Sequence, residues 1–466
     1  MERLLAENAA LRADNAALRA EVAELKVRVG QNSSNSSQPP SSDPPSVGPR
    51  PTRQPSGKKR GGQPGHSKYE QTLLEPERVR EVVDCLPQGC RRCGRALSGL
   101  DPEPLRHQVV DIPKVVAEAV EYRLHRCRCT DCGITTVGAL PDGVPTTMIG
   151  PRLSAVIAIC GGAFRLSKRM TQELLANFFD ADVSLGMISK TEQAVGTAVA
   201  PAIEEVAQAM QAQPFVNADE TSWCEARQKA WLWVAATGTM ACFLIRRRRG
   251  GEVAKELLGA DFGGILGADR WSAYNWVDYL RRQFCWAHLK RHFKLFEDIG
   301  GDARPVGVAL QEATRRLFKN WHRVRDGTLR HATFCAYARP LREQINDLLR
   351  QGIRCRSRRV ASMCREILEG QHSMWTFLRH EGIEPTNNLA ERALRHAVVW
   401  RKSSYGTDSE SGSRFVERML TTVQTLRLQK RNVLEYVVAA CDAKLHGRTT
   451  PSLLPALRGH DLANAA

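Results

Sequence analysis

Two acidic residues follow short strand-like runs of the sequence. Residues 215–218 lead into Asp219, and residues 264–268 lead into Asp269. Runs rich in aromatic and β-branched residues, bounded by Gly or polar residues, are typical of strands. If the two strand ends lie side by side, their carboxylates repel each other unless a divalent cation lies between them. Carboxylate oxygens are hard ligands that suit Mg2+ or Mn2+, so the sequence predicts a metal site at these aspartates.

Glu391 is the third acid of interest, because it lies in the first turn of a predicted helix. Pro385, Asn387 and Asn388 are typical of residues that begin a helix. The spacing from Asn388 to Glu391 is also that of a capping box, in which the glutamate satisfies the start of the helix. The two roles are compatible, since a glutamate in the first turn has a fixed direction.

Further strands and helices must hold these acids in place. Residues 231–236 and 242–245 have the pattern of strands, and residues 252–258 have that of a helix. The predicted fold class is therefore multidomain α+β, with a core in which helices back a mixed sheet.

The chain is strongly basic. Its 466 residues carry a formal net charge of +17, and its pI is near 9.5. This charge indicates a polyanionic partner, most simply nucleic acid; the alternative is a basic but inert surface. The run Arg246–Arg249 lies close to the acids in sequence. It would either contact a phosphate backbone or form a solvated hairpin edge.

Six of the 14 cysteines lie between residues 85 and 132. Four of them form two CxxC pairs about 35 residues apart, a spacing that lets four thiolates close around one ion. We predict one structural zinc ion with the ligands Cys90, Cys93, Cys129 and Cys132. Between the pairs, residues 109–112 and 120–124 are predicted strands. Cys85 and Cys127 are either alternative ligands or buried structural thiols.

A seven-residue repeat of leucine marks residues 1–29. The repeating residues are Leu4, Leu11, Leu18 and Leu25. Asn or Val fills the other core position, and acids and bases flank the core so that each acid meets a base on a parallel partner. The pattern predicts a two-stranded coiled coil and hence a homodimer. The alternative is an isolated amphipathic helix, although about 25 residues with few apolar positions are marginally stable alone.

Between this repeat and the strand-rich region lie a linker and a helical segment. Residues 30–79 are rich in Ser, Pro and Asn and cannot build a core. Within them Lys58, Lys59 and Arg60 form either an arm that contacts DNA or a solvated linker end. Residues 166–179 and 184–194 are predicted helices joined by a short connection, which fits a helix-turn-helix and an ordinary helical hairpin equally.

The sequence thus predicts eight segments in one cytoplasmic chain. The first residues are charged rather than apolar, and no apolar run approaches the roughly 20 residues that span a bilayer. The segments are 1–29 (coiled coil), 30–79 (linker), 80–140 (zinc-binding module), 141–213 (helical segment), 214–275 (first part of the core), 276–383 (helical insertion), 384–440 (last core helices) and 441–466 (tail).

Several motifs, taken in order along the chain, resemble transposases of the insertion-sequence 66 family. They are QNSSNSS at 31–37, GGQPGH at 61–66, NADETSW at 217–223, WLW at 231–233, DRWSAY at 269–274, CWAHLKR at 285–291 and NNLAER at 387–392. The resemblance covers nearly the whole chain. Asn217 departs from it, because His is more common at that position, but the three acids are unaffected.

The resemblance implies an RNase-H-like DDE transposase. It implies catalytic carboxylates at Asp219, Asp269 and Glu391 that hold two Mg2+ (or Mn2+) ions, a zinc-finger-like module, and accessory proteins encoded beside the transposase. Cys285 and His288 resemble a Cys-x-x-His feature of other DDE transposases, which we interpret as a support of the site and not as a metal pair.

The expected reaction is cleavage at transposon ends followed by strand transfer into target DNA. Four bases near Glu391 are expected to hold the double-stranded DNA through its phosphates: Arg392, Arg395, Arg401 and Lys402. Two alternatives stay open. A non-enzymatic, zinc-containing dimeric repressor would need no acids at strand ends, and an RNase-H-like nuclease would cut DNA without joining it.

Overall fold

The computed structural model describes residues 73–455 and isolated positions between residues 3 and 35. Two compact units divide the chain: residues 48–117, and the remainder. Among the described residues, no helix has both the length and the apolar character that a membrane crossing requires.

Two predictions fall wholly or partly outside the described residues. The basic arm at residues 58–60 lies outside them. In the heptad segment Leu4 and Leu25 lie outside them, whereas Leu11 and Leu18 are helical and exposed. The coiled coil and the homodimer therefore stay predictions.

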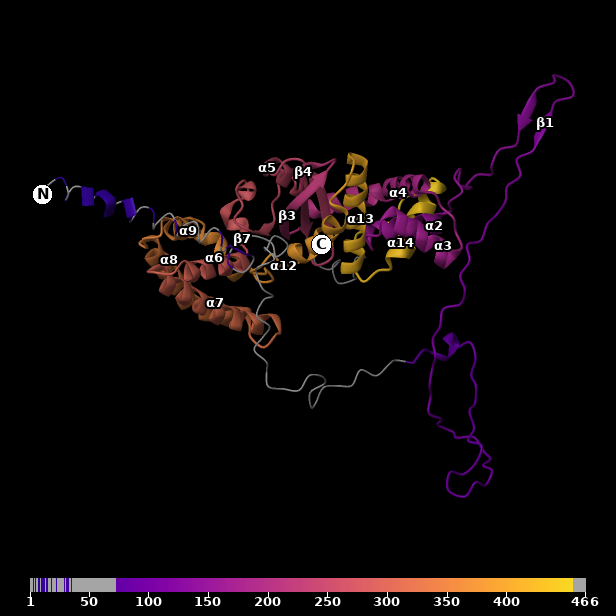
Figure 1. Ribbon diagram of the computed structural model, residues 1–466, viewed down its shortest axis with the longest axis horizontal. Helices are drawn as coiled ribbons and strands as arrows, with labels where there is room; N and C mark the ends of the chain where they lie inside the picture. Colours follow the sequence, from indigo (N-terminus) through magenta and orange to yellow (C-terminus); the bar gives the residue numbers. More distant parts are fainter. Residues whose placement is uncertain are drawn as a thin grey trace, which may run out of the picture. The chain divides into compact units, whose positions relative to one another are not determined.

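A five-stranded mixed sheet lies at the centre of the larger unit (Figure 1). The strands are β3 (Phe215–Glu225), β4 (Gln228–Ala236), β5 (Ala241–Arg246), β6 (Ile265–Ala268) and β7 (Arg282–Phe284). Their order is β5-β4-β3-β6-β7, in which β3, β4 and β5 are antiparallel while β6 and β7 run parallel to β3. The four strands predicted from the sequence are all present, but β3 continues for six residues beyond Asp219, so this acid lies within its strand and not at the strand end. The sequence does not predict β7, because its three residues contain no apolar run.

Helices that precede, interrupt and follow the strands in the sequence pack with this sheet in one hydrophobic core. They are α2 (Pro151–Gly162), α4 (Leu185–Gln211), α5 (Gly251–Leu258), α12 (Asn388–Ser404), α13 (Glu410–Leu428) and α14 (Val433–Leu445). Helix α12 packs against β3 and β4, and α5 packs against β4 and β5. The predicted mixed α/β architecture is therefore present.

Both edges of the sheet are covered by hydrogen bonds from side chains. At the β5 edge, three side chains four residues apart on α13 accept the amide protons of alternate residues. These pairs are Ile245 N–H with Glu417 Oε1, Phe243 N–H with Thr421 Oγ1 (3.1 Å), and Ala241 N–H with Thr425 Oγ1 (3.1 Å). At the β7 edge, the Thr376 hydroxyl donates to the backbone carbonyl of Arg282. Unpaired strand edges invite aggregation, and these contacts satisfy backbone groups that would otherwise stay unpaired there.

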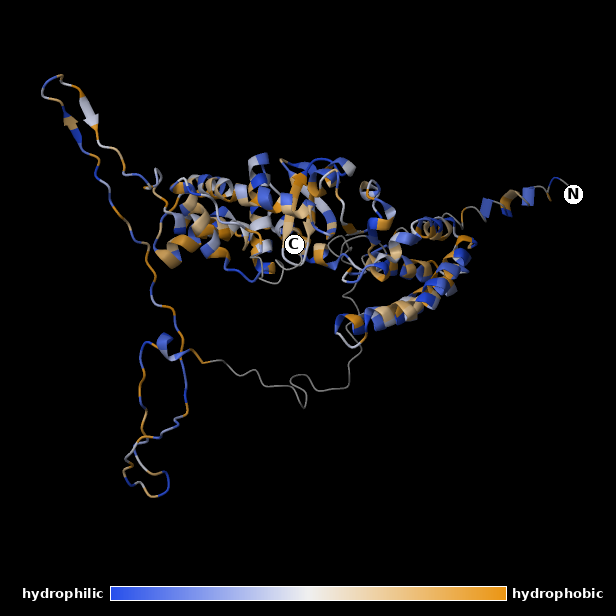
Figure 2. Cartoon of the chain, turned by 180° about the vertical axis from the view of Figure 1, so that it is seen from behind, coloured by the Kyte–Doolittle hydropathy of each residue, from blue (hydrophilic) through white to orange (hydrophobic). Residues whose placement is uncertain are grey.

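The helical insertion begins directly after β7 and has its own aromatic core. Its helices are α6 (Trp286–Ile299), α7 (Ala303–Arg325), α8 (His331–Ile353), α9 (Arg358–Glu369), α10 (Gln371–Met374) and α11 (Thr376–Arg379). Trp286 and Trp375 meet edge to face at 4.9 Å in this core. Hydrophilic and hydrophobic residues alternate along these helices, as in amphipathic helices (Figure 2). The predicted helical insertion is thus a helical lobe, and Phe215 of β3 and Ile265 of β6 also pack against its core.

The predicted helices before the sheet are also present. Helix α3 (Lys168–Phe179) ends at Asp180, which adopts a left-handed conformation with φ 53°, and α4 starts after Ser184. Ile157, Leu175 and Ile188 form a small core between α2, α3 and α4. This packing fits both interpretations of the segment, so its role in DNA binding stays a prediction.

The prediction of two strands between the cysteine pairs is wrong. Residues 109–112 and 120–124 are irregular, and short strands pair instead at β1 (Arg126–Arg128) and β2 (Thr135–Val137). The apolar side chains that suggested the strands are exposed. A strand gains its stability by burying one face, and these residues have no such face.

Candidate active site

The register of the sheet places two of the predicted acids side by side. β3 pairs with β6 in parallel, and Asn217 lies opposite Gly267. Asp219, within β3, lies two residues after Asn217, and Asp269, directly after β6, lies two residues after Gly267. Neighbouring strands lie about 4.8 Å apart, and residues at matching positions point to the same face. The two carboxylates therefore leave the sheet together.

Each aspartate is held by a backbone amide near it in sequence. Asp219 Oδ1 accepts a hydrogen bond from the Glu220 amide (2.9 Å), and Asp269 Oδ1 accepts one from the Trp271 amide (2.8 Å). These bonds fix the direction of both carboxyl groups, because the amides belong to the strand and loop that carry them.

Glu391 does not serve as a helix cap. Helix α12 begins at Asn388, and the residue before it, Asn387, occupies the N-cap position without a side-chain cap. Glu391 Oε1 is buried and has no hydrogen-bond partner among the described residues. The capping-box interpretation is therefore wrong. A buried carboxylate oxygen without a hydrogen bond is costly, which is expected where a ligand completes the site.

Cys285 and Asn387 tie together the three segments that carry the acids. The Cys285 amide donates to Ala268 O (2.9 Å), one residue before Asp269, and the Cys285 thiol accepts from the Asn387 amide (3.4 Å). Asn387 Nδ2 in turn donates to Ala218 O (3.4 Å), one residue before Asp219. Asn387 is fully buried, and its carbonyl accepts the amide of Glu391 (3.1 Å). One buried pair thus joins all three acid-bearing segments.

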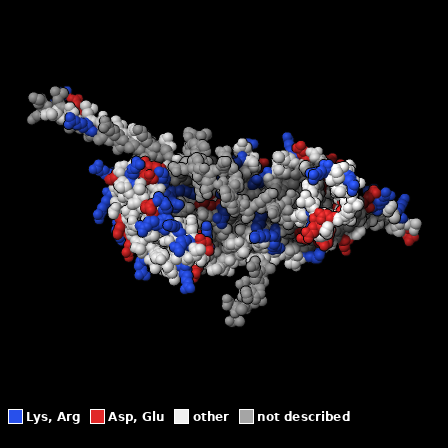
Figure 3. Space-filling model, turned by 90° about the horizontal axis from the view of Figure 1, so that it is seen from below, with Lys and Arg blue, Asp and Glu red and all other residues white. Residues whose placement is uncertain are grey.

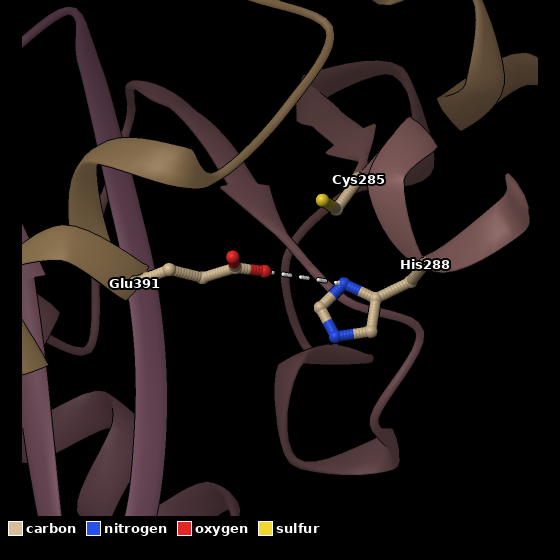
Figure 4. Close-up of side chains that lie close together, drawn as sticks. All are labelled: Cys285, His288 and Glu391. Carbon is tan, nitrogen blue, oxygen red and sulfur yellow. Dashed lines mark ion pairs between the residues drawn. The ribbon is translucent and has the colours of Figure 1, made fainter. Parts of the chain in front are cut away.

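The predicted pair of Cys285 and His288 lies beside Glu391. Figure 4 shows the three side chains turned toward one another, and their potential ligand atoms lie within 4.8 Å of each other. Glu391 Oε1 is 3.8 Å from both His288 Nδ1 and Arg291 Nη2. Burial raises the pKa of the Cys285 thiol to about 12, so the thiol keeps its proton and serves as a hydrogen-bond partner. The arrangement fits a supporting role for the pair.

Negative charge is concentrated at Asp219. Burial raises the pKa of Asp219 well above its ordinary value, and the carboxyl groups of Glu220, Asp269 and Glu391 raise it further. A divalent cation would relieve this repulsion, and oxygen donors of this kind suit Mg2+ or Mn2+. The donor set, and the Oε1 of Glu391 that accepts no hydrogen bond, therefore fit a metal of that class.

Comparison with known protein families gives an independent observation. The family model described as Transposase IS66 family matches residues 146–414, more than half of the chain. The chain belongs to the IS66 family of transposases. A second model, for a family of unknown function, matches residues 1–72 of this transposase.

Two relatives from Sinorhizobium fredii (strain NBRC 101917 / NGR234) are similar to this transposase. The uncharacterized protein y4hP is 26% identical over 392 residues, which are 76% of this chain and 69% of the relative. The uncharacterized protein y4qI is 25% identical over 402 residues, which are 78% and 71% of the two chains. Because neither name states a function, the family model alone supports the transposase function.

The four bases predicted to hold DNA divide into two groups in the transposase. Arg392, Arg395 and Lys402 are exposed along one face of α12. Arg401 is half-buried and donates to Thr221 Oγ1 (3.2 Å) and to Ser222 of β3. Arg401 therefore holds α12 against the sheet, whereas the other three bases are available to a partner.

Ion pairs within the protein engage most of the run Arg246–Arg249, but Arg247 and Arg248 are exposed, so a phosphate contact and a solvated edge both stay open for these two residues. Arg246 pairs with Glu417 and Glu256, Arg247 pairs with Glu225, and Arg249 pairs with Glu220. Three of the four guanidinium groups thus bind acids of the protein itself. The sequence does not show this, because the partner acids lie up to 171 residues away.

The two predicted zinc-binding pairs fold as two similar turns. In each turn, the backbone amide of the first cysteine donates to the carbonyl five residues later. The carbonyl of the same cysteine accepts a hydrogen bond from the amide of a glycine with φ 72°. The turns are Cys90–Arg95, with Gly94, and Cys129–Ile134, with Gly133. Backbone amides lower the pKa of Cys90 and of Cys129; the donors are Cys93 and Arg92 for the first, Cys132 and Asp131 for the second. Amides aimed at sulfur favour the thiolate that zinc requires. A single zinc ion shared by both turns stays a prediction.

The two spare cysteines are exposed. Cys85 and Cys127 both lie at the surface, so neither is a buried structural thiol. Exposure leaves them accessible as alternative ligands.

Sequence reasoning misses two groups of residues that shape the site. The sequence marks Asn387 by its place before a helix and in the motif NNLAER, but not its contacts, and nothing in the sequence connects Glu220 with Arg249. Both groups act through contacts between distant segments, which spacing along the chain does not encode.

Proposed function

We propose that this protein is a DNA transposase that cleaves transposon ends and transfers the freed strand to target DNA, with Asp219, Asp269 and Glu391 as its catalytic acids. The observation that carries the proposal is the common register of Asp219 and Asp269 on neighbouring parallel strands, to which Asn387 joins the segment of Glu391. We further propose that the five-stranded sheet is an RNase-H-like core.

The three carboxylates would hold two Mg2+ or Mn2+ ions. Metal ions bound there supply an activated water or 3′-hydroxyl and neutralise charge on the leaving oxygen of a phosphodiester. The chain's own residues bind and orient the reactants. His288 and Arg291 direct Glu391, and the exposed bases of α12 hold phosphates next to it. No side chain in this scheme becomes covalently linked to DNA.

Other parts of the chain would bring DNA and a second subunit to the site. We propose that Cys90, Cys93, Cys129 and Cys132 bind one structural zinc ion, and that the N-terminal heptads form a homodimer. The transposase would act on DNA in the bacterial cytoplasm, with accessory proteins encoded by the same element.

Two alternatives make different products. A dimeric repressor would bind transposon ends without cutting them, and a nuclease would cut them without joining. The test uses labelled transposon ends, defined by inverted repeats that flank the reading frame, with Mg2+ and a target plasmid. Joined product from the wild-type protein, and none from Asp219→Asn or Asp269→Asn proteins that still bind ends, is expected. Unchanged joining by either variant would remove that acid from the mechanism.

A further inference from the structure

Arg249 lies in an aromatic sandwich next to the acidic site. Its guanidinium carbon is 4.4 Å from the centre of the Trp231 ring and 4.0 Å from that of the Trp271 ring. Trp231 belongs to β4, and Trp271 belongs to the loop that follows Asp269. A cation stacked between two rings is attracted by both π faces, so Arg249 holds the strand and the loop together.

The edge of the same guanidinium group binds a buried acid. Arg249 Nη2 and Nε donate to Glu220 Oε1 at 2.7 and 3.0 Å. The other carboxylate oxygen, Glu220 Oε2, accepts a hydrogen bond from the Tyr274 hydroxyl (2.7 Å). The side chain of Glu220 is only 2% exposed. Both of its oxygens thus accept hydrogen bonds from protein groups, in contrast to Oε1 of Glu391, which accepts none.

The contacts of Arg249 converge on the segments that carry both aspartates. Glu220 directly follows Asp219 in β3. Trp271 donates its amide to Asp269 Oδ1 (2.8 Å), so the ring that stacks on Arg249 and the amide that orients Asp269 belong to one residue. A shift of the guanidinium group would therefore move the loop of Asp269 relative to the strand of Asp219.

We propose that Arg249 is a positioning residue that fixes the separation of Asp219 and Asp269, and through it the affinity of the site for a divalent cation. The proposal rests on the proposed function of these acids. Arg249 touches neither aspartate in the contacts described above, so it acts through Glu220 and Trp271. It also neutralises Glu220, the one further carboxylate adjacent to the site in sequence.

Arginine is required for this geometry, and lysine replaces only part of it. The planar guanidinium group stacks with both faces while its edge donates two hydrogen bonds to one carboxylate oxygen. An ammonium group keeps the charge next to Glu220 but has no flat face to place between two indoles. Arg249→Lys should therefore restore the electrostatic contribution without restoring the fixed position of the loop.

The experiment measures Mn2+ binding by the full-length protein, using calorimetry and the rise in melting temperature with added Mn2+. Arg249→Ala should weaken Mn2+ binding at least tenfold and raise by the same factor the Mn2+ concentration for half-maximal strand transfer. Arg249→Lys should fall between Arg249→Ala and the wild type. The matched control is Arg247→Ala, which breaks an ion pair with Glu225 in the same arginine run and should leave Mn2+ binding unchanged.

A second variant keeps the test decisive if Arg249→Ala does not fold. Trp271→Leu removes one face of the sandwich, leaves every charge in place, and should weaken Mn2+ binding several-fold. Wild-type Mn2+ affinity in a folded Arg249→Ala protein, or in Trp271→Leu when Arg249→Ala is unfolded, would overturn the proposal. Asp219→Asn separates the two hypotheses. If the Asp219→Asn protein binds Mn2+ as tightly as the wild type, the proposed function fails. If Asp219→Asn binds Mn2+ weakly while the Arg249 and Trp271 variants keep wild-type affinity, the positioning role alone fails.

Discussion

At the scale of single residues, the site depends on side chains that never contact a substrate. Asn387 is fully buried and uses its amide nitrogen, its side chain and its carbonyl to join Cys285, Ala218 and Glu391. Side chains at such junctions fix the geometry of a site because their own positions are set by several hydrogen bonds. Function and stability should therefore respond together when this residue changes.

Asn387→Ala tests this junction. The change leaves the buried carbonyl of Ala218 without its donor, and an unsatisfied buried group costs about 1–3 kcal/mol of stability. Strand transfer should fall at least tenfold, because the segment of Glu391 loses its link to β3. Denaturant unfolding and a strand-transfer assay measure the two effects. Asn388→Ala, one residue along and exposed, is the control, and an equal loss of activity in both variants would contradict a specific role for Asn387.

His292 provides a pH-dependent test at the same scale. Its Nδ1 lies 3.2 Å from Arg270 Nη2, and burial followed by the charge of Arg270 lowers the pKa of His292 to about 3. In the unfolded chain the pKa returns to about 6.5, so the unfolded state binds the extra proton between these values. The contribution of His292 to the free energy of unfolding is therefore complete above pH 6.5. It is lost as pH falls toward 3, by at most about 1.4 kcal/mol per pH unit.

The measurement compares urea unfolding of the wild type and His292→Asn at pH 7, 6 and 5. The variant should be less stable at pH 7 but should lose less stability on acidification than the wild type. Parallel stability curves for the two proteins would show that His292 titrates normally in the folded state.

At the scale of elements, local patterns predict the strands but not their edges. The runs that become β3, β4, β5 and β6 each bury apolar side chains, and this burial is what sequence periodicity reports. β7 has no such run. Its position is set instead by pairing with β6 and by the hydrogen bond of Gln283. The two aspartates are predictable because they terminate apolar runs, whereas Arg249 and Asn387 depend on contacts between segments far apart in sequence.

The covering of the β5 edge by α13 gives a prediction for an element. Thr421→Val keeps the shape of the side chain but removes the hydroxyl that accepts the Phe243 amide (3.1 Å). The variant should be less stable by about 1–3 kcal/mol, because a buried amide loses its partner. Thr421→Ser keeps the hydroxyl and should lose clearly less. Chemical denaturation of the three proteins measures the difference, and equal losses in both variants would assign the effect to packing instead of the hydrogen bond.

At the scale of the whole molecule, the basic side chains divide into exposed ones and ones that bind groups of the protein itself. Lys and Arg side chains gather over the lobe of the helical insertion in the view of Figure 3. Many basic side chains near the acids are engaged internally, such as Arg249 with Glu220 and Arg401 with β3. The net charge of +17 therefore measures attraction for a polyanion, but only the exposed bases can contact its phosphates.

The exposed bases of α12 allow this distinction to be measured through salt dependence. Each phosphate contact that is lost should reduce the slope of log K against log salt concentration by about 0.9 on duplex DNA. Changing Arg392, Arg395 and Lys402 together to Ala should therefore lower the slope by about 2.7 if each contacts one phosphate. Fluorescence anisotropy with duplex DNA at several salt concentrations gives the slope. The control is Arg350→Ala on α8, an exposed base paired with Asp347, which should leave the slope unchanged. If the triple variant also keeps the wild-type slope, α12 does not hold the DNA backbone, and the phosphates must lie on another basic surface of the transposase.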